Sequence, residues 1–190
     1  MSIEKVSTTD SMDATVTRGA SFKEDVNLSG VYTATCIGPD GKIKWTDTFE
    51  NTVVTQGKNH LLDTYLAGSS YTSAWFLGLI SSVGYSAIAA GDTAGSHSGW
   101  TEANTYSEGT RQAPTFSAAS SGSKATSSDV GFSINASVTV KGAFLTSNNT
   151  KTSTTNGGAN DILYSAGLFS GGDKVLGSGD TLNVSYTASA

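Results

Sequence analysis

This chain has little charge, little proline and a single cysteine. Only 14% of its 190 residues are charged, where about 25% is usual for soluble domains. The lone Cys36 excludes a disulfide within the chain and permits folding in a reducing cytoplasm. Eleven basic residues against 16 acidic ones give a formal net charge of −5, and the basic residues are scattered. Because nucleic-acid binding needs clustered Lys and Arg to neutralise phosphates, we expect no nucleic-acid partner.

Segments that insert a chain into a membrane, or export it, are also missing. No run approaches the roughly 18 consecutive apolar residues of a membrane-spanning helix. The N-terminus, which reads Met-Ser-Ile-Glu-Lys, lacks the basic region and apolar stretch of a signal peptide. We therefore expect no signal peptide and no membrane partner.

Motifs that carry chemistry are sparse. The sequence has no G-x-S-x-G elbow, because its nearest match, Gly95-Ser96-His97-Ser98-Gly99, has histidine where the nucleophilic serine would stand. The two histidines, His60 and His97, and the one cysteine are too far apart in sequence to form a zinc motif. We expect no catalytic residues, no bound metal and no cofactor, and hence a protein that is not an enzyme.

The residues that are abundant predict a β protein. Apolar and polar residues alternate over residues 31–37 and 42–49, and Pro39-Asp40-Gly41 between them favours a turn, which together predict a β-hairpin. Further strands are predicted at residues 74–80, 113–119, 130–134, 138–145, 162–169 and 181–187. Short strands separated by Gly- and Ser-rich turns predict a mainly β single domain, a β-sandwich or jelly-roll-like fold.

One segment has helical periodicity. Residues 57–67 place Leu61, Leu62, Tyr65 and Leu66 on one apolar stripe, which predicts a short helix that closes one end or edge of the β fold. Together with the large apolar residues of the predicted strands, this stripe supplies the expected core. The predicted core residues are Trp45, Phe49, Leu62, Leu66, Trp75, Leu79, Phe116, Phe132, Phe144, Leu163, Phe169 and Leu182.

The first 27 residues differ from the rest of the chain. They are polar, carry charges of both signs, and hold isolated apolar residues without a sustained period. Such a segment buries too little apolar surface to offset the entropy of its own ordering. We interpret residues 1–27 as an extended N-terminal arm that orders against a neighbouring subunit, and residues 28–190 as the β domain.

A polar loop at residues 91–110 contains the candidate site. It is too polar for a buried strand and too rich in distinct side chains for a linker. Its candidate residues, including the arginine that follows it, are Asp92, His97, Trp100, Glu102, Tyr106 and Arg111. We expect a structural role for them: Asp92 bonding turn amides, Trp100 anchoring the loop to the core, and Glu102 pairing with Arg111. The outer surface of the loop would then contact a neighbouring subunit.

Two other interpretations of this loop stay open. Asp92, His97 and Glu102 carry metal-ligating groups that would bind an ion if they converged. Trp100 offers an aromatic face of the kind that binds sugars. Neither alternative is demanded by the spacing of these residues.

Several runs of this sequence, taken in order, resemble a family of small virion proteins of tailed bacteriophages. The similarity extends over residues 30–188 and concerns the order of the runs. These are Thr52–Leu66, Trp75–Ile80, Asp92–Glu102 with Tyr106 and Arg111, Lys141–Leu145, Leu163–Phe169 and Gly179–Thr187.

This resemblance implies a structural protein of the phage particle, assembled in the host cytoplasm. Its partners would be the major capsid protein or other virion subunits, with self-association on the particle, and it brings no catalytic residues. An acidic surface suits the outside of the head, which faces away from packaged DNA, so we expect a capsid decoration or cement protein. The alternative is a tail or fibre component that recognises the host surface through carbohydrate. A fibre protein more often shows repeats or a trimerising helix, and the sequence has neither.

Overall fold

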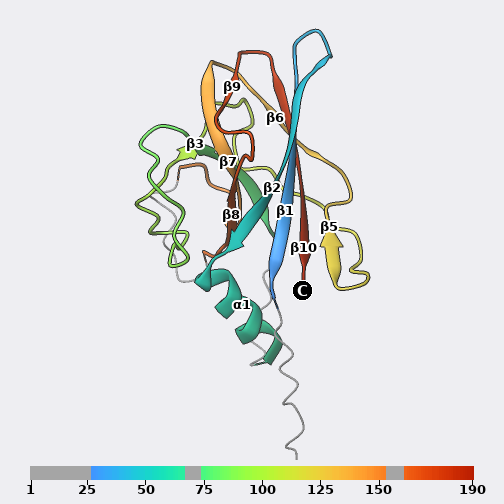
Figure 1. Ribbon diagram of the computed structural model, residues 1–190, viewed down its shortest axis with the longest axis vertical. Helices are drawn as coiled ribbons and strands as arrows, with labels where there is room; N and C mark the ends of the chain where they lie inside the picture. Colours follow the sequence, from blue (N-terminus) through green and yellow to red (C-terminus); the bar gives the residue numbers. More distant parts are fainter. Residues whose placement is uncertain (1–26, 67–73, 153–160) are drawn as a thin grey trace, which may run out of the picture.

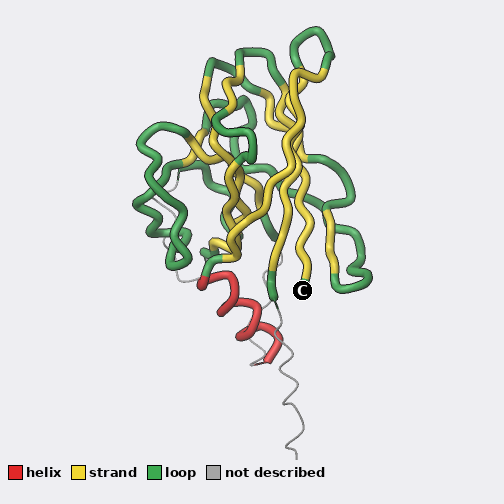
Figure 2. The backbone as a smooth tube through the Cα atoms, in the orientation of Figure 1, coloured by secondary structure: helices red, strands yellow, loops and turns green. Residues whose placement is uncertain are grey.

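The computed structural model describes residues 27–66, 74–152 and 161–190, and it confirms a mainly β chain with one helix (Figures 1 and 2). The described residues form ten strands and the helix α1 (Thr55–Leu66). The strands are β1 (Ser29–Ile37), β2 (Ile43–Val53), β3 (Phe76–Ser81), β4 (Glu102–Ala103), β5 (Ser123–Ala125), β6 (Val130–Ser133), β7 (Val138–Thr146), β8 (Leu163–Leu168), β9 (Lys174–Leu176) and β10 (Thr181–Ser189). Residues 1–26 of the predicted arm lie outside the described residues, so its extended form stays a prediction.

The strands pair antiparallel in one open sheet. Its order is β4-β3-β7-β8-β2-β1-β10-β5, with β6 also pairing with β10 and β9 with β7. Strand β2 joins the two halves because it changes partner along its length: its first part pairs with β1, and Asn51–Val53 pairs with β8. Apolar side chains of both halves then meet in one core, which gives the sandwich-like arrangement that the sequence predicts.

The predicted hairpin is confirmed. Strand β1 alternates in burial, with Tyr32, Ala34 and Cys36 fully buried on the core face. In the turn that follows, Asp40 Oδ1 accepts the Lys42 amide over 3.1 Å and Gly41 has a φ of 77°. Glycine adopts this left-handed conformation without the steric cost that a side chain brings, so the turn residues explain the register of the hairpin.

Most of the predicted core is buried. Seven of the twelve residues are buried, and three more, Trp45, Trp75 and Phe116, pack against the core while partly exposed. The seven are Phe49, Leu79, Phe132, Phe144, Leu163, Phe169 and Leu182. The prediction was wrong for the two helix residues, because Leu62 is 51% exposed and Leu66 is 74% exposed. The core also contains three tyrosines that we did not predict, Tyr32, Tyr106 and Tyr186.

Helix α1 is seated on the sheet mainly by its first turn, and His60 in its second turn contacts the ring of Trp75 with the centroids 5.9 Å apart. Its one buried residue is Gly57, where an added Cβ would lie 2.4 Å from the backbone oxygen of Tyr164 in β8. Gln56 fixes the same turn: its Nε2 donates to the Asp161 carbonyl, and its Oε1 accepts the amides of Ala94 and Leu163. The rest of α1 projects past the end of the sheet (Figure 1). Leu62 and Leu66 of the apolar stripe therefore lie outside the core, contrary to the expectation.

The half of the sheet made by β3, β7 and β8 is covered on both faces. One face contributes to the main core, and the other carries a second cluster in which Ile80, Phe144 and Leu163 meet Trp100 from the loop. Strand β3 is accordingly buried at five of its six positions. A sheet with two covered faces explains the unbroken apolar run of this strand. Within the described residues, α1 is neither long nor apolar enough to span a membrane.

Candidate functional site

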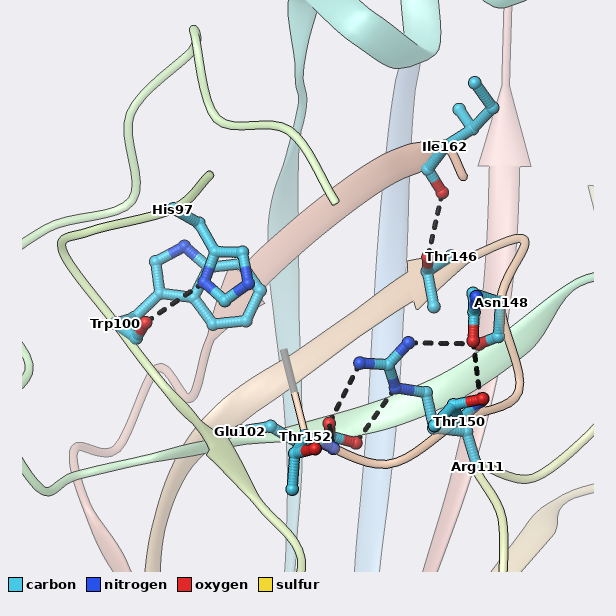
Figure 3. Close-up of polar contacts among 9 residues, drawn as sticks. All are labelled: His97, Trp100, Glu102, Arg111, Thr146, Asn148, Thr150, Thr152 and Ile162. Atoms are coloured by element: carbon cyan, nitrogen blue, oxygen red, sulfur yellow. Dashed lines mark hydrogen bonds and ion pairs between the residues drawn. The ribbon is translucent and has the colours of Figure 1, made fainter. Parts of the chain in front are cut away.

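Trp100 lies at the centre of the polar loop and closes it onto the sheet. Its side chain is 2% exposed, and its ring centroid lies 5.1 Å from that of Phe144 in β7. His97 stacks on the indole with the ring centroids 3.9 Å apart and the planes 24° apart (Figure 3). The indole is thus enclosed by its own chain. Trp100 therefore offers no face to a sugar, and the carbohydrate interpretation of this residue was wrong.

Asp92 and His97 both form hydrogen bonds with Trp100. Trp100 Nε1 donates to Asp92 Oδ2 over 2.9 Å, and the same oxygen accepts the Ala89 amide over 2.9 Å. His97 Nδ1 lies 3.0 Å from the Trp100 carbonyl oxygen. Both polar side chains are buried, with exposed fractions of 7% and 9%. Buried polar groups that satisfy one another in this way stabilise a single loop conformation.

Glu102 and Arg111 form a buried ion pair. Arg111 Nε and Nη2 donate to the two carboxylate oxygens of Glu102 over 3.0 and 2.9 Å, and the side chains are 2% and 1% exposed. Arg111 Nη1 also donates to the Asn148 carbonyl, and Glu102 Oε2 accepts the Thr152 amide (Figure 3). The Arg111 guanidinium stands 5.0 Å from the ring centroid of Phe144. The pair therefore ties residues 102–111 to residues 148–152 by charge-assisted hydrogen bonds.

Tyr106 belongs to the main core that both halves of the sheet share. It is 2% exposed and packs edge-on against Phe132, with the centroids 5.0 Å apart. Lys151 Nζ lies 3.9 Å from the centre of its ring and donates to the Tyr106 carbonyl over 2.9 Å. Burial raises the pKa of the Tyr106 phenol, with the nearby Glu102 carboxylate adding to the shift. The phenol is thus held protonated, as suits a packing role.

Five of the six candidate residues form two groups, and Tyr106 packs apart from both against Phe132. Asp92 and His97 surround Trp100, whereas Glu102 is held by Arg111, so these three metal-ligating side chains do not converge as the metal interpretation required. Among the described residues, no cluster of three or more potential metal ligands occurs. All of these side chains are buried, so only the outer backbone and the remaining side chains of the loop face solvent. Contact with a neighbouring subunit through that outer surface stays a prediction.

Another buried carboxylate whose oxygens are hydrogen-bonded within the protein lies at the turn between β8 and β9. Asp47 in β2 accepts the amides of Ser170 and Gly171 over 3.2 and 3.0 Å, and it pairs with Lys174 Nζ at 3.1 Å. Burial acts to raise the pKa of the Asp47 carboxyl, but the hydrogen bonds from Ser170, Gly171 and Lys174 outweigh it and lower the pKa. This carboxylate therefore fixes a turn, as the loop carboxylates do.

The feature that sequence analysis missed is a cavity of about 530 Å³ between α1 and the sheet. Its walls are apolar and aromatic: Leu61 and Tyr65 come from α1, while Trp75, Tyr164 and Tyr186 come from the sheet side. The centroids of Trp75 and Tyr164 are 5.6 Å apart, and burial raises the pKa of both tyrosine phenols in the sheet wall. The volume falls in the range of small binding sites. Leu61 and Tyr65 of the apolar stripe on the helix indicated this cavity in the sequence, but we had assigned the stripe to the core.

Comparison of the chain with known proteins finds no matching family model, no similar curated protein and no matching solved structure. The resemblance to phage virion proteins therefore remains a prediction.

Proposed function

We propose that this protein is a structural subunit of a bacteriophage particle, a decoration protein that binds the outside of the head. The observation that carries the proposal is the exposed outer stripe of α1. Leu62 and Leu66 lie one helical turn apart and are 51% and 74% exposed on a helix that projects past the sheet. Adjacent apolar side chains presented in this way are typical of protein–protein contact surfaces.

The chemistry of the loop supports a structural role over a catalytic one. Asp92, His97, Glu102 and Arg111 are buried and bonded to one another or to the backbone. A general base or nucleophile must reach a substrate, and these groups are already bonded within the protein. These four residues therefore stabilise the fold that positions α1.

The formal charge of −5 supports a position on the outside of the head. A protein facing packaged DNA would meet phosphate repulsion, while one on the outer surface avoids it. In the tail or fibre alternative, Trp100 would not be the residue that contacts a sugar, because its indole is covered by His97.

The experiment measures co-sedimentation with undecorated heads of the phage whose genome encodes this chain. Wild-type protein is compared with L62S/L66S and with the matched control V83S/V175S, whose valines are 75% and 65% exposed elsewhere. We expect wild type and control to bind alike. The leucine variant should bind at least about tenfold more weakly, since each buried leucine contributes about 1.5–3 kcal/mol.

Three results would contradict the proposal in different ways. Failure of the wild-type protein to bind heads, with binding to host cells instead, would favour the tail position. Binding to neither would remove the virion assignment. Equal binding of wild type and L62S/L66S would show that the head contacts another surface of the protein.

A further inference from the structure

The cavity beside α1 is built to be occupied. Its aromatic walls, which include Trp75 and Tyr164, would face water if nothing filled it, and Tyr65 at its edge is 84% exposed. Thr64 Oγ1 on the same wall is buried and has no hydrogen-bond partner among the described residues. An occupant with apolar side chains and a backbone hydrogen-bonding group would satisfy both needs. That combination is a polypeptide segment rather than a hydrocarbon ligand.

The described chain begins against the wall of this cavity. Gly30 in β1 is the register partner of Ala188 in β10, and Ala188 lines the cavity. A Cβ added to Gly30 would meet the ring of Tyr186, another wall residue, at 2.8 Å or less. The start of β1, helix α1 and the C-terminus lie at the same end of the molecule (Figure 1). The described chain therefore begins beside the cavity.

One residue of that segment has the chemistry of an anchor. Phe22 is the single aromatic residue among residues 1–26, and Val16 and Val26 flank it at a distance. Phe22 stands eight residues before Gly30, and an extended chain of eight residues spans up to about 26 Å. That length exceeds what is needed to bring Phe22 from the β1 start to the adjacent cavity.

We infer that residues 16–26 occupy this cavity in the same chain, with Phe22 inserted between α1 and the sheet. A short tether gives its segment an effective concentration on the order of millimolar at a site within reach. A second copy at micromolar concentration competes about a thousandfold less well. The same chain is therefore the occupant. This inference concerns the free protein and is independent of the proposed function. It departs from the expectation that the arm binds a neighbouring subunit, because the cavity beside Gly30 offers a closer partner.

Disulfide trapping in the full-length chain tests the inference. Ser21 is changed to Cys next to the anchor, and Lys124 is changed to Cys on the cavity wall. The native Cys36 stays unreactive, since it is 0% exposed and burial raises its pKa to about 11. The matched control is S7C/K124C, which places the first cysteine far from Phe22. A third protein carries F22S on the S21C/K124C background.

We expect S21C/K124C to form a disulfide within the monomer about tenfold faster than S7C/K124C, because docking holds position 21 at the cavity. F22S should bring the rate down to that of the control. Equal rates for S21C/K124C and S7C/K124C, or no effect of F22S, would overturn the inference. A disulfide-linked dimer in place of the crosslinked monomer would also overturn it and would assign the cavity to a second copy.

An apolar dye gives an independent readout in the full-length chain without cysteine changes. F22S should raise the fluorescence of the dye ANS several-fold by opening the cavity, whereas V6S should leave it at the wild-type value. Identical signals from the three proteins would contradict docking of Phe22 even if all of them fold normally.

Discussion

The polar loop and helix α1 both lie at the margin of the same sheet. They differ in whether their side chains find partners within the protein. In the loop, Asp92, His97 and Trp100 bond or stack with one another, and the indole is 2% exposed. On α1, Leu62 and Leu66 remain largely exposed. A segment of polar composition thus completes a core, whereas the segment with the apolar pattern presents its apolar side chains outward. Polarity alone therefore does not show which of the two regions is buried in this protein and which is exposed.

The largest effect should come from breaking the ion pair that closes the loop. Glu102→Ala leaves the Arg111 guanidinium buried without its partner, and we expect a loss of about 3–5 kcal/mol in the free energy of unfolding. Urea denaturation followed by circular dichroism measures it. The control is Lys42→Ala, which removes the exposed pair with Asp40 and should cost at most about 1 kcal/mol. Similar losses in both variants would mean that the buried pair adds no more than a surface one.

Removing the loop anchor should have a comparable effect. Trp100→Ala deletes a buried indole that contacts Phe144, so we expect a cost of about 3–5 kcal/mol. Val83→Ala in the same stretch of chain, at a residue 75% exposed, should change stability by less than about 0.5 kcal/mol. A Trp100→Ala protein that melts with wild-type cooperativity and midpoint would show that the loop is not part of the core.

A smaller effect is expected where α1 meets the sheet. Gly57→Ala adds a methyl group against the backbone of Tyr164, and we expect a cost of about 1–3 kcal/mol despite the better helix propensity of alanine. The comparison is Gly91→Ala, where an added Cβ meets nothing within 4 Å. Thermal denaturation of both variants measures the difference. If Gly57→Ala is as stable as wild type, the first turn of the helix is not tightly seated.

The Asp47 carboxylate at the β8–β9 turn should make the free energy of unfolding depend on pH, with an effect of similar size. The pKa of Asp47 is lower in the folded state than the unfolded value of about 3.9. Its contribution is therefore complete above about pH 4 and is lost as the pH falls through the folded pKa. Asp47→Asn should lose about 1.5–3 kcal/mol at pH 7 and show a shallower decline in stability in acid. Urea denaturation at pH 7, 4 and 3 measures this, and parallel curves for variant and wild type would exclude the effect.

The smallest effect on stability should come from the outer stripe of α1. L62S/L66S alters two exposed side chains, so we expect a change of no more than about 1 kcal/mol in the free energy of unfolding. Denaturation of the isolated protein measures it. A loss above about 3 kcal/mol would mean that this stripe is covered in the free protein, and the contrast between loop and helix would disappear.

Local patterns predicted most of the strands. The alternation in residues 31–37 and the turn at residues 39–41 gave the hairpin with correct faces, because side-chain direction in a strand follows from neighbouring residues alone. Of the candidate site, the pairing of Glu102 with Arg111 and the anchoring position of Trp100 were predicted as the structure has them. Tyr106 was predicted only as a structural residue of the loop, and its packing on Phe132 was not foreseen because that contact joins distant segments.

The sequence by itself determined that this protein is mainly β, that one helix follows the second strand, and which strand faces are apolar, since these depend on periods of two and 3.6 residues. Only the tertiary structure decided where the helix points. Gly57 against Tyr164 and Gln56 against Asp161 seat its first turn and direct the rest past the sheet. The amphipathic pattern specifies that an apolar face exists but not its partner, because the partner depends on contacts between residues more than 100 positions apart.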